Sequence, residues 1–264
     1  MSRLCPLFSG SSGNCYYIGS QNEGVLIDAG RSAKQLTNML ANCNIAIAAV
    51  KAIFVTHEHS DHVNGLRVFA SKNHIDVYSS RGTLDSLDNS GTLTSDFHSD
   101  VVPPNGMECA SMLIQPFHTS HDCAEGYGYK IRTSDDRTIA FSTDLGYISS
   151  EVREMITGSD LVVMESNHDV GMLQNGRYPY PLKRRILSDR GHLSNEVCAG
   201  ELPALAQKGT IRFVLAHLSS ENNTPDLAYQ TALCSLSMAG LQNGIDFELS
   251  VAPRENSVGK TILF

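Results

Sequence analysis

Residues 56–62 read Thr56-His57-Glu58-His59-Ser60-Asp61-His62 and follow directly on an apolar, β-branched-rich run, 48–55. That run predicts a buried strand, so the polar residues lie at a strand end. In a turn that leaves the strand, His57 and His59 can point the same way and bind one cation. Asp61 and His62, at the start of the next helix, can face a second. Imidazole nitrogen and carboxylate oxygen suit zinc, and also manganese or iron, without any thiolate.

The alternative to a metal site is a polar loop whose histidines are merely surface residues. For a single histidine, that alternative would be preferred. Four potential ligands within six positions at a strand end favour metal binding instead. The segment therefore predicts a metal site.

The composition is that of an ordinary globular protein. The chain has 264 residues, of which 41% are hydrophobic and 18% charged, enough apolar material for a sizeable core. This length fits one large α/β domain or two small ones, and without a linker or an internal repeat we expect one domain, 1–264. The net charge of −8 argues against a protein that coats nucleic acid through its overall charge, although it is compatible with a local basic patch.

The cysteine pattern and the hydropathy bear on location. The seven cysteines are scattered, with no Cys-x-x-Cys pair, which disfavours both a disulfide framework and a thiolate zinc site and suits a reducing cytoplasm. The N-terminal segment lacks the apolar region of a signal peptide, and no run approaches the roughly 18 apolar residues that span a bilayer. We therefore expect a soluble cytoplasmic protein without a membrane partner.

Polar residues also follow several other apolar runs. Strands are predicted at 15–18, 24–27, 48–55, 76–78, 112–116, 127–132, 138–142, 161–164, 211–216 and 247–251, and helices at 31–42, 63–73, 195–206 and 225–239. Five of these strands lead into Asp28, His57, Asp144, Glu165 and His217. Because strand ends gathered along one edge of a sheet form a rigid platform, the recurrence predicts a shared site.

The motif at 57–62 resembles the signature of the metallo-β-lactamase superfamily, and later segments match that family in order. His121, in His121-Asp-Cys-Ala-Glu-Gly-Tyr-Gly-Tyr-Lys, resembles the third-motif ligand of the ribonuclease Z-like branch. Asp144, in Phe-Ser-Thr-Asp-Leu-Gly-Tyr, looks like the carboxylate that bridges two metals. His217, in Leu-Ala-His-Leu-Ser-Ser-Glu-Asn-Asn, looks like the last ligand.

The resemblance implies a centre with two divalent metal ions, of which zinc is favoured and manganese or iron(II) are alternatives. It gives one ion the ligands His57, His59 and His121, and the other Asp61, His62 and His217. Asp144 is shared between the two ions.

Further segments narrow the resemblance to the bacterial YycJ/WalJ group. They are Ser9-Gly-Ser-Ser-Gly-Asn-Cys, Asp28-Ala-Gly, Glu165-Ser-Asn-His-Asp and Gly191-His-Leu-Ser-Asn, so the likeness runs from residue 9 to about 223. The group resemblance implies an α/β fold of the four-layer αββα sandwich type. It also implies a DNA phosphodiesterase, a 5′-to-3′ exonuclease, with DNA as its partner.

Several candidate residues have two readings. His118 competes with His121 for the third-motif position, and its alternative is a loop histidine bonded to backbone. In the family, an aspartate like Asp28 typically supports a ligand imidazole and fixes its tautomer, whereas a plain turn or cap is the alternative. Glu165 has the same two readings.

His192 resembles a histidine that contacts phosphate in ribonuclease Z-like enzymes and can protonate the leaving oxygen. Its alternative is a structural turn, in which Ser194 caps the helix that follows. His168 and Asp169 either contact substrate or close a loop.

Two segments are candidates for substrate contact. The basic run Lys183-Arg184-Arg185, with Arg190 nearby, is either a solvated helix face or a nucleic-acid contact beside His192. The segment 9–14 is either a flexible turn or a small-residue loop whose backbone approaches a phosphate; its polar side chains are Ser9, Ser11, Ser12 and Asn14.

The reaction predicted from these residues is metal-assisted hydrolysis of a phosphodiester. Two cations lower the pKa of a bridging water from about 16 towards about 7 and so supply hydroxide at neutral pH. Asp61 or Asp144 would orient the hydroxide, and His192 would donate a proton to the leaving alkoxide.

Two alternatives to a DNA phosphodiesterase stay open from the sequence. One is a small-molecule hydrolase of the same fold, acting on a cyclic phosphodiester, a thioester or a lactone. The other is a non-catalytic binding module, which the complete ligand set disfavours.

Overall fold

The computed structural model describes residues 2–264, and the chain divides into two compact units. Unit 1 contains the residues up to Pro116, Cys123–Arg137 and Pro253–Phe264; unit 2 contains Phe117–Asp122 and Thr138–Ala252. Within the described part of the chain, no helix has the length and apolar character required to cross a membrane.

Unit 1 is built on a mixed sheet with the strand order β14-β1-β2-β3-β4-β5-β6. Its strands are β1 (Arg3–Phe8), β2 (Cys15–Gly19), β3 (Gly24–Ile27), β4 (Val50–Phe54), β5 (Asp76–Ser79), β6 (Ser99–Val101) and β14 (Ile262–Leu263). The neighbours from β14 to β3 are antiparallel, whereas β3, β4, β5 and β6 run parallel. The parallel pair β3 and β4 therefore delivers the residues that follow each of them, Asp28 and Thr56, to the same edge of the sheet.

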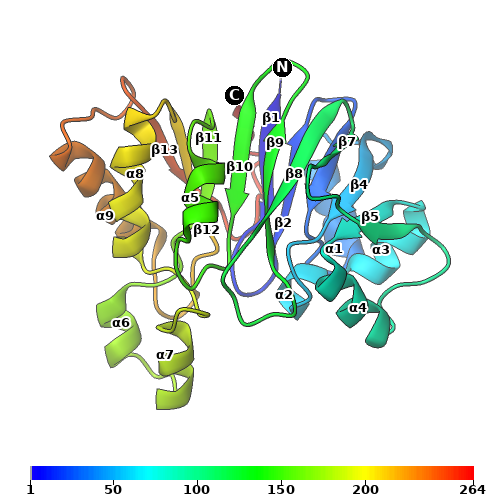
Figure 1. Ribbon diagram of the computed structural model, residues 1–264, viewed down its shortest axis with the longest axis horizontal. Coiled ribbons are helices and arrows are strands. Elements are labelled where there is room, and N and C mark those ends of the chain that lie inside the picture. The colour runs from blue at the N-terminus through cyan, green and yellow to red at the C-terminus, as the bar shows by residue number, and fades with distance from the viewer. Residues whose placement is uncertain (1) are drawn as a thin grey trace. The chain divides into compact units, whose positions relative to one another are not determined.

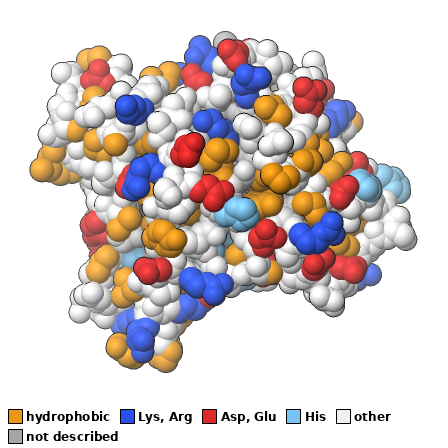
Figure 2. Space-filling model, viewed as in Figure 1, with side chains coloured by type: hydrophobic (Ala, Val, Ile, Leu, Met, Phe, Trp, Pro, Cys, Tyr) orange, Lys and Arg blue, Asp and Glu red, His pale blue; other side chains and the backbone are white. Residues whose placement is uncertain are grey.

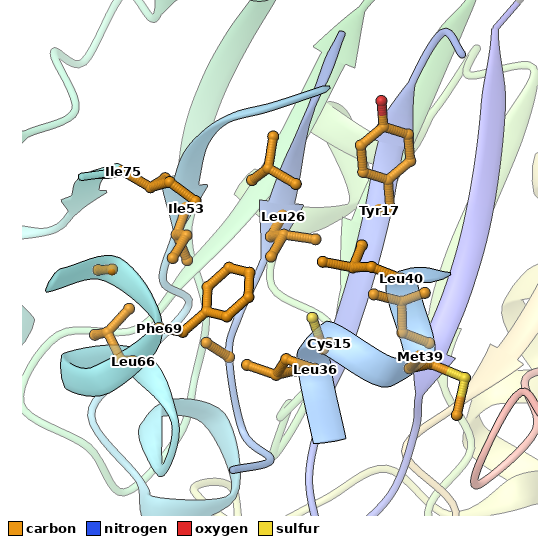
Figure 3. Packing of buried hydrophobic residues seen from close by; sticks show 14 of the residues in the cluster. Cys15, Tyr17, Leu26, Leu36, Met39, Leu40, Ile53, Leu66, Phe69 and Ile75 are labelled. Atoms are coloured by element: carbon orange, nitrogen blue, oxygen red, sulfur yellow. The ribbon is translucent and has the colours of Figure 1, made fainter. Parts of the chain in front are cut away.

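The helices of unit 1 cover this sheet and close its core. They are α1 (Ala33–Asn42), the short 3-10 turn η1 (Ile47–Ala49), α2 (Ser60–Val63), α3 (Leu66–Asn73) and α4 (Arg81–Asn89). Leu36 and Leu40 of α1 and Phe69 of α3 pack against Leu26 and Ile53 of the sheet (Figure 3). This fully apolar packing holds the strands that carry the histidine segment.

Unit 1 also contains β7 (Met107–Cys109), most of β8 (Met112–His118) and β9 (Tyr127–Arg132). β7 and β8 form an antiparallel hairpin. The backbone N–H of Tyr127 donates to the Thr56 carbonyl (2.9 Å), and the Tyr129 hydroxyl donates to the Val55 carbonyl (2.6 Å). β9 thus holds the end of β4 just before His57.

Unit 2 contains four parallel strands in the order β13-β12-β11-β10. They are β10 (Thr138–Ser142), β11 (Leu161–Glu165), β12 (Arg212–Ala216) and β13 (Glu248–Val251). The helices are α5 (Ser150–Ile156), α6 (Val170–Asn175), α7 (Tyr180–Ile186), α8 (Asn195–Gln207) and α9 (Pro225–Met238). Figure 1 shows α8 and α9 side by side, and their apolar residues pack with those of β12 in one core. Because the strands are parallel, the residues that follow β10, β11 and β12 share one edge of the sheet.

Most elements predicted from the sequence are confirmed, and the differences have local causes. The helix predicted at 31–42 begins at Ala33, because the Ser32 side chain accepts the Gln35 N–H as its N-cap. The strand predicted at 48–55 begins only at Val50, after η1. The single helix predicted at 63–73 is wrong at its start, because α2 ends at Val63 and α3 begins at Leu66.

Candidate metal centre

In unit 1 the histidine segment forms a tight cluster at the end of β4. His57 and His62 are buried, with 1% and 0% of their surface exposed, and their ring centroids are 4.1 Å apart. The rings of His57 and His59 are 4.5 Å apart, and Asp61 Oδ2 lies 3.6 Å from His62 Nε2. The structure therefore brings together the four candidate ligands of this segment.

Asp28 supports this cluster through a buried carboxylate. Its Oδ2 lies 2.7 Å from His62 Nδ1, and its Oδ1 accepts the backbone N–H of Thr56 at 2.8 Å. The Thr56 hydroxyl donates to Oδ2 at 2.9 Å. Burial raises the pKa of Asp28, an effect that the contacts with His62 and Thr56 partly offset. Asp28 therefore holds the Nδ1 side of His62, the geometry that a carboxylate supporting a ligand imidazole would have.

Replacing Asp28 with asparagine tests this support. Asp28→Asn keeps an oxygen for the Thr56 N–H but loses the carboxylate that accepts from His62 Nδ1. Loss of such a partner typically weakens metal binding about 10–100-fold, which we expect here. Competition against a chromogenic zinc chelator measures it, and Asp88→Asn on the exposed face of α4 is the control. Equal zinc affinity in both variants would show that Asp28 does not support metal binding through His62.

The loop at residues 9–14 lies partly inside the cluster. Asn14, only 1% exposed, places its Nδ2 3.1 Å from His62 Nε2, and its backbone N–H donates to the Asp61 carbonyl at 2.7 Å. Ser9 is buried and accepts a hydrogen bond from the Tyr16 hydroxyl (2.6 Å). Of the four polar side chains in this candidate segment, only Ser11 and Ser12 are exposed. Asn14 was a candidate site residue, but its contact with His62 could not be predicted from the sequence.

Gly30 allows the close approach that holds Asp61 in place. Its N–H donates to the Asn14 carbonyl (2.8 Å), and a Cβ added at Gly30 would lie 1.7 Å from the Asp61 carbonyl oxygen. Such a contact requires a shift of the backbone. Gly30 therefore fixes the distance between two loops that carry candidate site residues.

Gly30→Ala is expected to cost about 2–3 kcal/mol of unfolding free energy, the upper range for overpacking, and to lower metal content. Urea unfolding and metal analysis measure the two effects. Gly200→Ala is a matched control, because no atom lies within 4 Å of its added Cβ and it sits in the middle of α8. That control should be neutral or gain up to about 1 kcal/mol. Similar stability of the two variants would contradict the packing argument.

In unit 2, two candidate ligands share an unusual backbone conformation. Asp144 follows β10 with φ 59°, and His217 follows β12 with φ 54°. Asp28 in unit 1 has φ 63°. Left-handed conformations of non-glycine residues cluster at functional sites, where the surrounding structure enforces them. Eight non-glycine residues in the described part of the chain have positive φ, and these three strand-end residues are the ones among them that belong to the candidate site.

Glu165 holds two histidines of unit 2 in place through its buried carboxylate. Glu165 is fully buried at the end of β11. Its Oε1 accepts hydrogen bonds from His192 Nδ1 at 2.8 Å and from His217 Nδ1 at 2.9 Å. Its Oε2 accepts the backbone N–H groups of Leu145 (2.9 Å) and Leu193 (3.1 Å). Burial raises the pKa of Glu165, but His192 and His217 more than compensate, and the pKa lies well below its ordinary value. The carboxylate stays charged and orients two imidazoles.

His121, rather than His118, lies beside Asp144. His121 Nε2 is 3.7 Å from Asp144 Oδ1, and its Nδ1 is 2.9 Å from the Gly191 carbonyl oxygen. Burial lowers the pKa of His121. His118 is exposed, with Nδ1 3.2 Å from Glu151 Oε1. The Asp144 carboxylate also lies 3.2 Å from His217 Nδ1, so it is close to two of the candidate ligands in this unit.

The remaining candidates have mixed surroundings. The His192 side chain is 15% exposed, and Ser194 caps α8 by accepting the Val197 N–H (3.2 Å). Asp169 caps α6 by accepting the Met172 N–H (2.6 Å), which favours its loop-closing reading. His168 is 1% exposed, and neither ring nitrogen has a hydrogen-bond partner among residues 2–264. Burial lowers the pKa of His168.

The side chains of each unit fit divalent metal ions. A histidine that binds metal through Nε2 usually gives its other ring N–H to a carboxylate or carbonyl oxygen. His62, His121 and His217 all have such an oxygen at Nδ1, from Asp28, Gly191 and Glu165 respectively. In unit 2, ligand atoms of Asp144, Glu165, His192 and His217 lie within 4.8 Å of one another. The donors are nitrogen and oxygen, the set expected from the sequence.

Comparison with known proteins places these residues in a family context. The model of the β-lactamase superfamily domain matches residues 24–218. Exodeoxyribonuclease WalJ of Streptococcus pneumoniae serotype 2 (strain D39 / NCTC 7466) is 37% identical over 246 residues, which cover 92% of this chain and 91% of that protein. Exodeoxyribonuclease YycJ of Bacillus anthracis is 37% identical over 244 residues, which cover 92% of each.

A solved structure shows the same fold. The metallo-β-lactamase fold protein YhfI from Bacillus subtilis aligns with a TM-score of 0.69 and 15% identity, over 99% of this chain and 98% of that one. Together with the two mixed sheets and their flanking helices, this likeness confirms the fold class predicted from the sequence.

Proposed function

Because this chain belongs to the metallo-β-lactamase superfamily, we propose that it is a metal-dependent exonuclease that degrades DNA from the 5′ end. Two curated relatives at 37% identity are exodeoxyribonucleases, and both align over 92% of the chain. The observation that carries the proposal is the buried Glu165 carboxylate, which orients a candidate ligand, His217, and a candidate proton donor, His192. A binding module without catalytic activity would not need the proton donor His192.

The proposed centre holds two ions, with zinc favoured and manganese or iron(II) as alternatives. His57, His59 and His121 would hold one ion, and Asp61, His62 and His217 the other, with Asp144 shared. The support for this assignment is the nitrogen and oxygen donor set, the oxygen partner at Nδ1 of three histidines, and the order of the motifs along the chain.

We also propose that residues 1–264 act as one functional domain in a reducing cytoplasm. The family model runs from residue 24 to 218 and so draws on segments of both units. All seven cysteines, each of them among the described residues, are free thiols. Both observations support the proposal.

The chain's own residues have distinct tasks in phosphodiester hydrolysis. When bound, the ions would activate the attacking water and neutralise charge on the phosphate. The carboxylate of Asp61 or Asp144 orients that water. His192 keeps one proton at Nδ1, where Glu165 accepts it, and donates the other from Nε2 to the leaving alkoxide oxygen. The Glu165 carboxylate holds the Nδ1 side of His192 through this hydrogen bond.

A panel of labelled polymers tests the substrate class. Single- and double-stranded DNA and RNA, each labelled at one end, are incubated with the protein and Mn²⁺ or Zn²⁺. We expect release of nucleotides from the 5′ end of DNA. If no polymer is cleaved while a cyclic phosphodiester, thioester or lactone is hydrolysed, the DNA assignment is wrong and the small-molecule alternative takes its place.

A further inference from the structure

A strongly basic segment of unit 2 precedes His192. Residues 176–190, here called the basic arm, include α7 and contain Arg177, Lys183, Arg184, Arg185 and Arg190 but only one acidic residue, Asp189. The arm has a net charge of +4 in a chain whose net charge is −8. Lys and Arg side chains gather at the lower left of Figure 2, where Figure 1 places α7.

Three of the five cations fasten the arm to unit 2. Lys183 Nζ donates to the carbonyl oxygens of Gln174 (2.8 Å) and Gly176 (2.7 Å). Arg185 forms a bidentate ion pair with Asp122, and the Arg190 guanidinium donates to the His121 carbonyl (3.3 Å). The contacts of Arg185 and Arg190 hold the arm against the loop that carries His121.

The other two cations are available to a ligand. Arg177 and Arg184 are exposed, and neither forms a hydrogen bond or an ion pair with its side chain among residues 2–264. A helix face that served only solubility would not need five Lys and Arg residues so close in sequence to a candidate active-site histidine. Two unpaired guanidinium groups are suited to bind phosphate groups.

The arm also presents an exposed aromatic ring. Tyr180, the first residue of α7, is 73% exposed and lies between Pro179 and Pro181. The two proline rings restrict the backbone around it and so limit the conformational entropy lost on binding. An aromatic ring beside cations is the arrangement on which unpaired bases stack.

Backbone hydrogen bonds join the arm directly to the candidate centre of unit 2. The His192 N–H donates to the carbonyl of Ile186, the last residue of α7, at 3.0 Å. The Gly191 carbonyl, between the arm and His192, lies 2.9 Å from His121 Nδ1. The C-terminal end of α7 is therefore held directly beside His192.

We propose that the basic arm binds single-stranded DNA, with Arg177 and Arg184 on phosphates and Tyr180 stacked on an unpaired base. The inference rests on the proposed nuclease function and specifies the form of its substrate. In a duplex the neighbouring bases of the stack cover both faces of an internal base, so the Tyr180 ring can stack only on a base that has left the stack or lies at an end. The arm therefore selects frayed or single-stranded ends.

Binding of a phosphorothioate-linked single-stranded 12-mer, followed by fluorescence anisotropy of the metal-loaded protein, tests this proposal. Arg177→Gln with Arg184→Gln should weaken binding at least tenfold and reduce the slope of log affinity against log salt by about 1.4, or 0.7 for each phosphate that is no longer neutralised. Tyr180→Ala should weaken binding about tenfold or more, whereas Tyr180→Phe should bind with nearly wild-type affinity because it keeps the aromatic ring. Bound metal per chain should equal the wild-type value in every arm variant.

A charge-matched control separates the arm from net charge. Lys72→Gln with Lys208→Gln removes two exposed cations elsewhere, on α3 and at the end of α8, and should leave affinity within twofold of wild type. If the arginine variant binds as tightly as this control while wild type degrades DNA, the arm inference is wrong and the proposed function stands. If wild type binds the 12-mer but degrades no DNA, the proposed function fails instead. The same titration is run with a duplex 12-mer: if the arm variants lose affinity for the duplex but keep wild-type affinity for the single strand, the assignment to single strands is wrong.

Discussion

Asp144→Ala is expected to lower DNA turnover by at least about 10³-fold and to reduce the metal content of the protein. Asp144 is 2% exposed, and its Oδ1 lies 3.2 Å from His217 Nδ1 and 3.7 Å from His121 Nε2. Removing the carboxylate takes away the proposed shared ligand and leaves two buried imidazoles without their acidic neighbour. Nucleotide release and metal analysis of the same sample measure the two effects together.

The backbone at Asp144 requires its own controls. Its φ of 59° is costly for alanine, so part of any loss could come from strain. Asp144→Asn keeps the size and tolerates this conformation, yet it should lose activity to a similar extent because the negative charge is gone. Asp136→Ala places alanine at φ 58° in an exposed turn and should retain full activity. Full turnover by a metal-verified Asp144→Ala protein would contradict the assignment.

His192→Ala is expected to reduce turnover about 10²–10⁴-fold, the usual contribution of a positioned general acid, while both metal ions stay bound. The distinction follows from its position: Glu165 occupies Nδ1 at 2.8 Å, and 15% of the side chain remains exposed, enough to meet a substrate. Glu165 would keep its contact with His217 in the variant. The ligand environment is therefore left largely intact.

Single-turnover rates and metal content distinguish a proton donor from a ligand at residue 192. A slow chemical step with an unchanged metal content is the expected result. A substrate whose leaving group needs no proton, such as a p-nitrophenyl phosphodiester, should lose much less rate in the variant than DNA does. Loss of metal together with activity would make His192 a ligand and overturn its proposed role.

Periodicity and strand-end chemistry were enough to predict much of the fold. The buried runs that became β3, β4, β10, β11 and β12 all ended within one residue of the predicted position, because a parallel strand buried on both faces consists of continuous apolar sequence. α7 was not predicted as a helix, since Pro179 and Pro181 obscure the periodic pattern even though proline is tolerated in a first turn. The break between α2 and α3 was also not predicted, because Gly65 interrupts an apolar pattern that is otherwise continuous.

The candidate site was predictable where chemistry is concentrated in short motifs, and less so where contacts cross the sequence. The spacing of His57, His59, Asp61 and His62 indicated a metal cluster directly. The buried contact of Asn14 with His62 depends on a loop 48 residues away, and no local pattern encodes it. The same is true of the ion pair between Arg185 and Asp122, which holds the basic arm in place and which no local pattern encodes.

The most direct test of a metal-dependent DNA exonuclease is the rate of nucleotide release from DNA as metal is returned to metal-depleted protein. We expect no release without metal, a rate that rises with the amount of bound ion, and a plateau at two ions per chain. Full activity in the depleted protein, or saturation of the metal sites with no nucleotide released, would contradict the account.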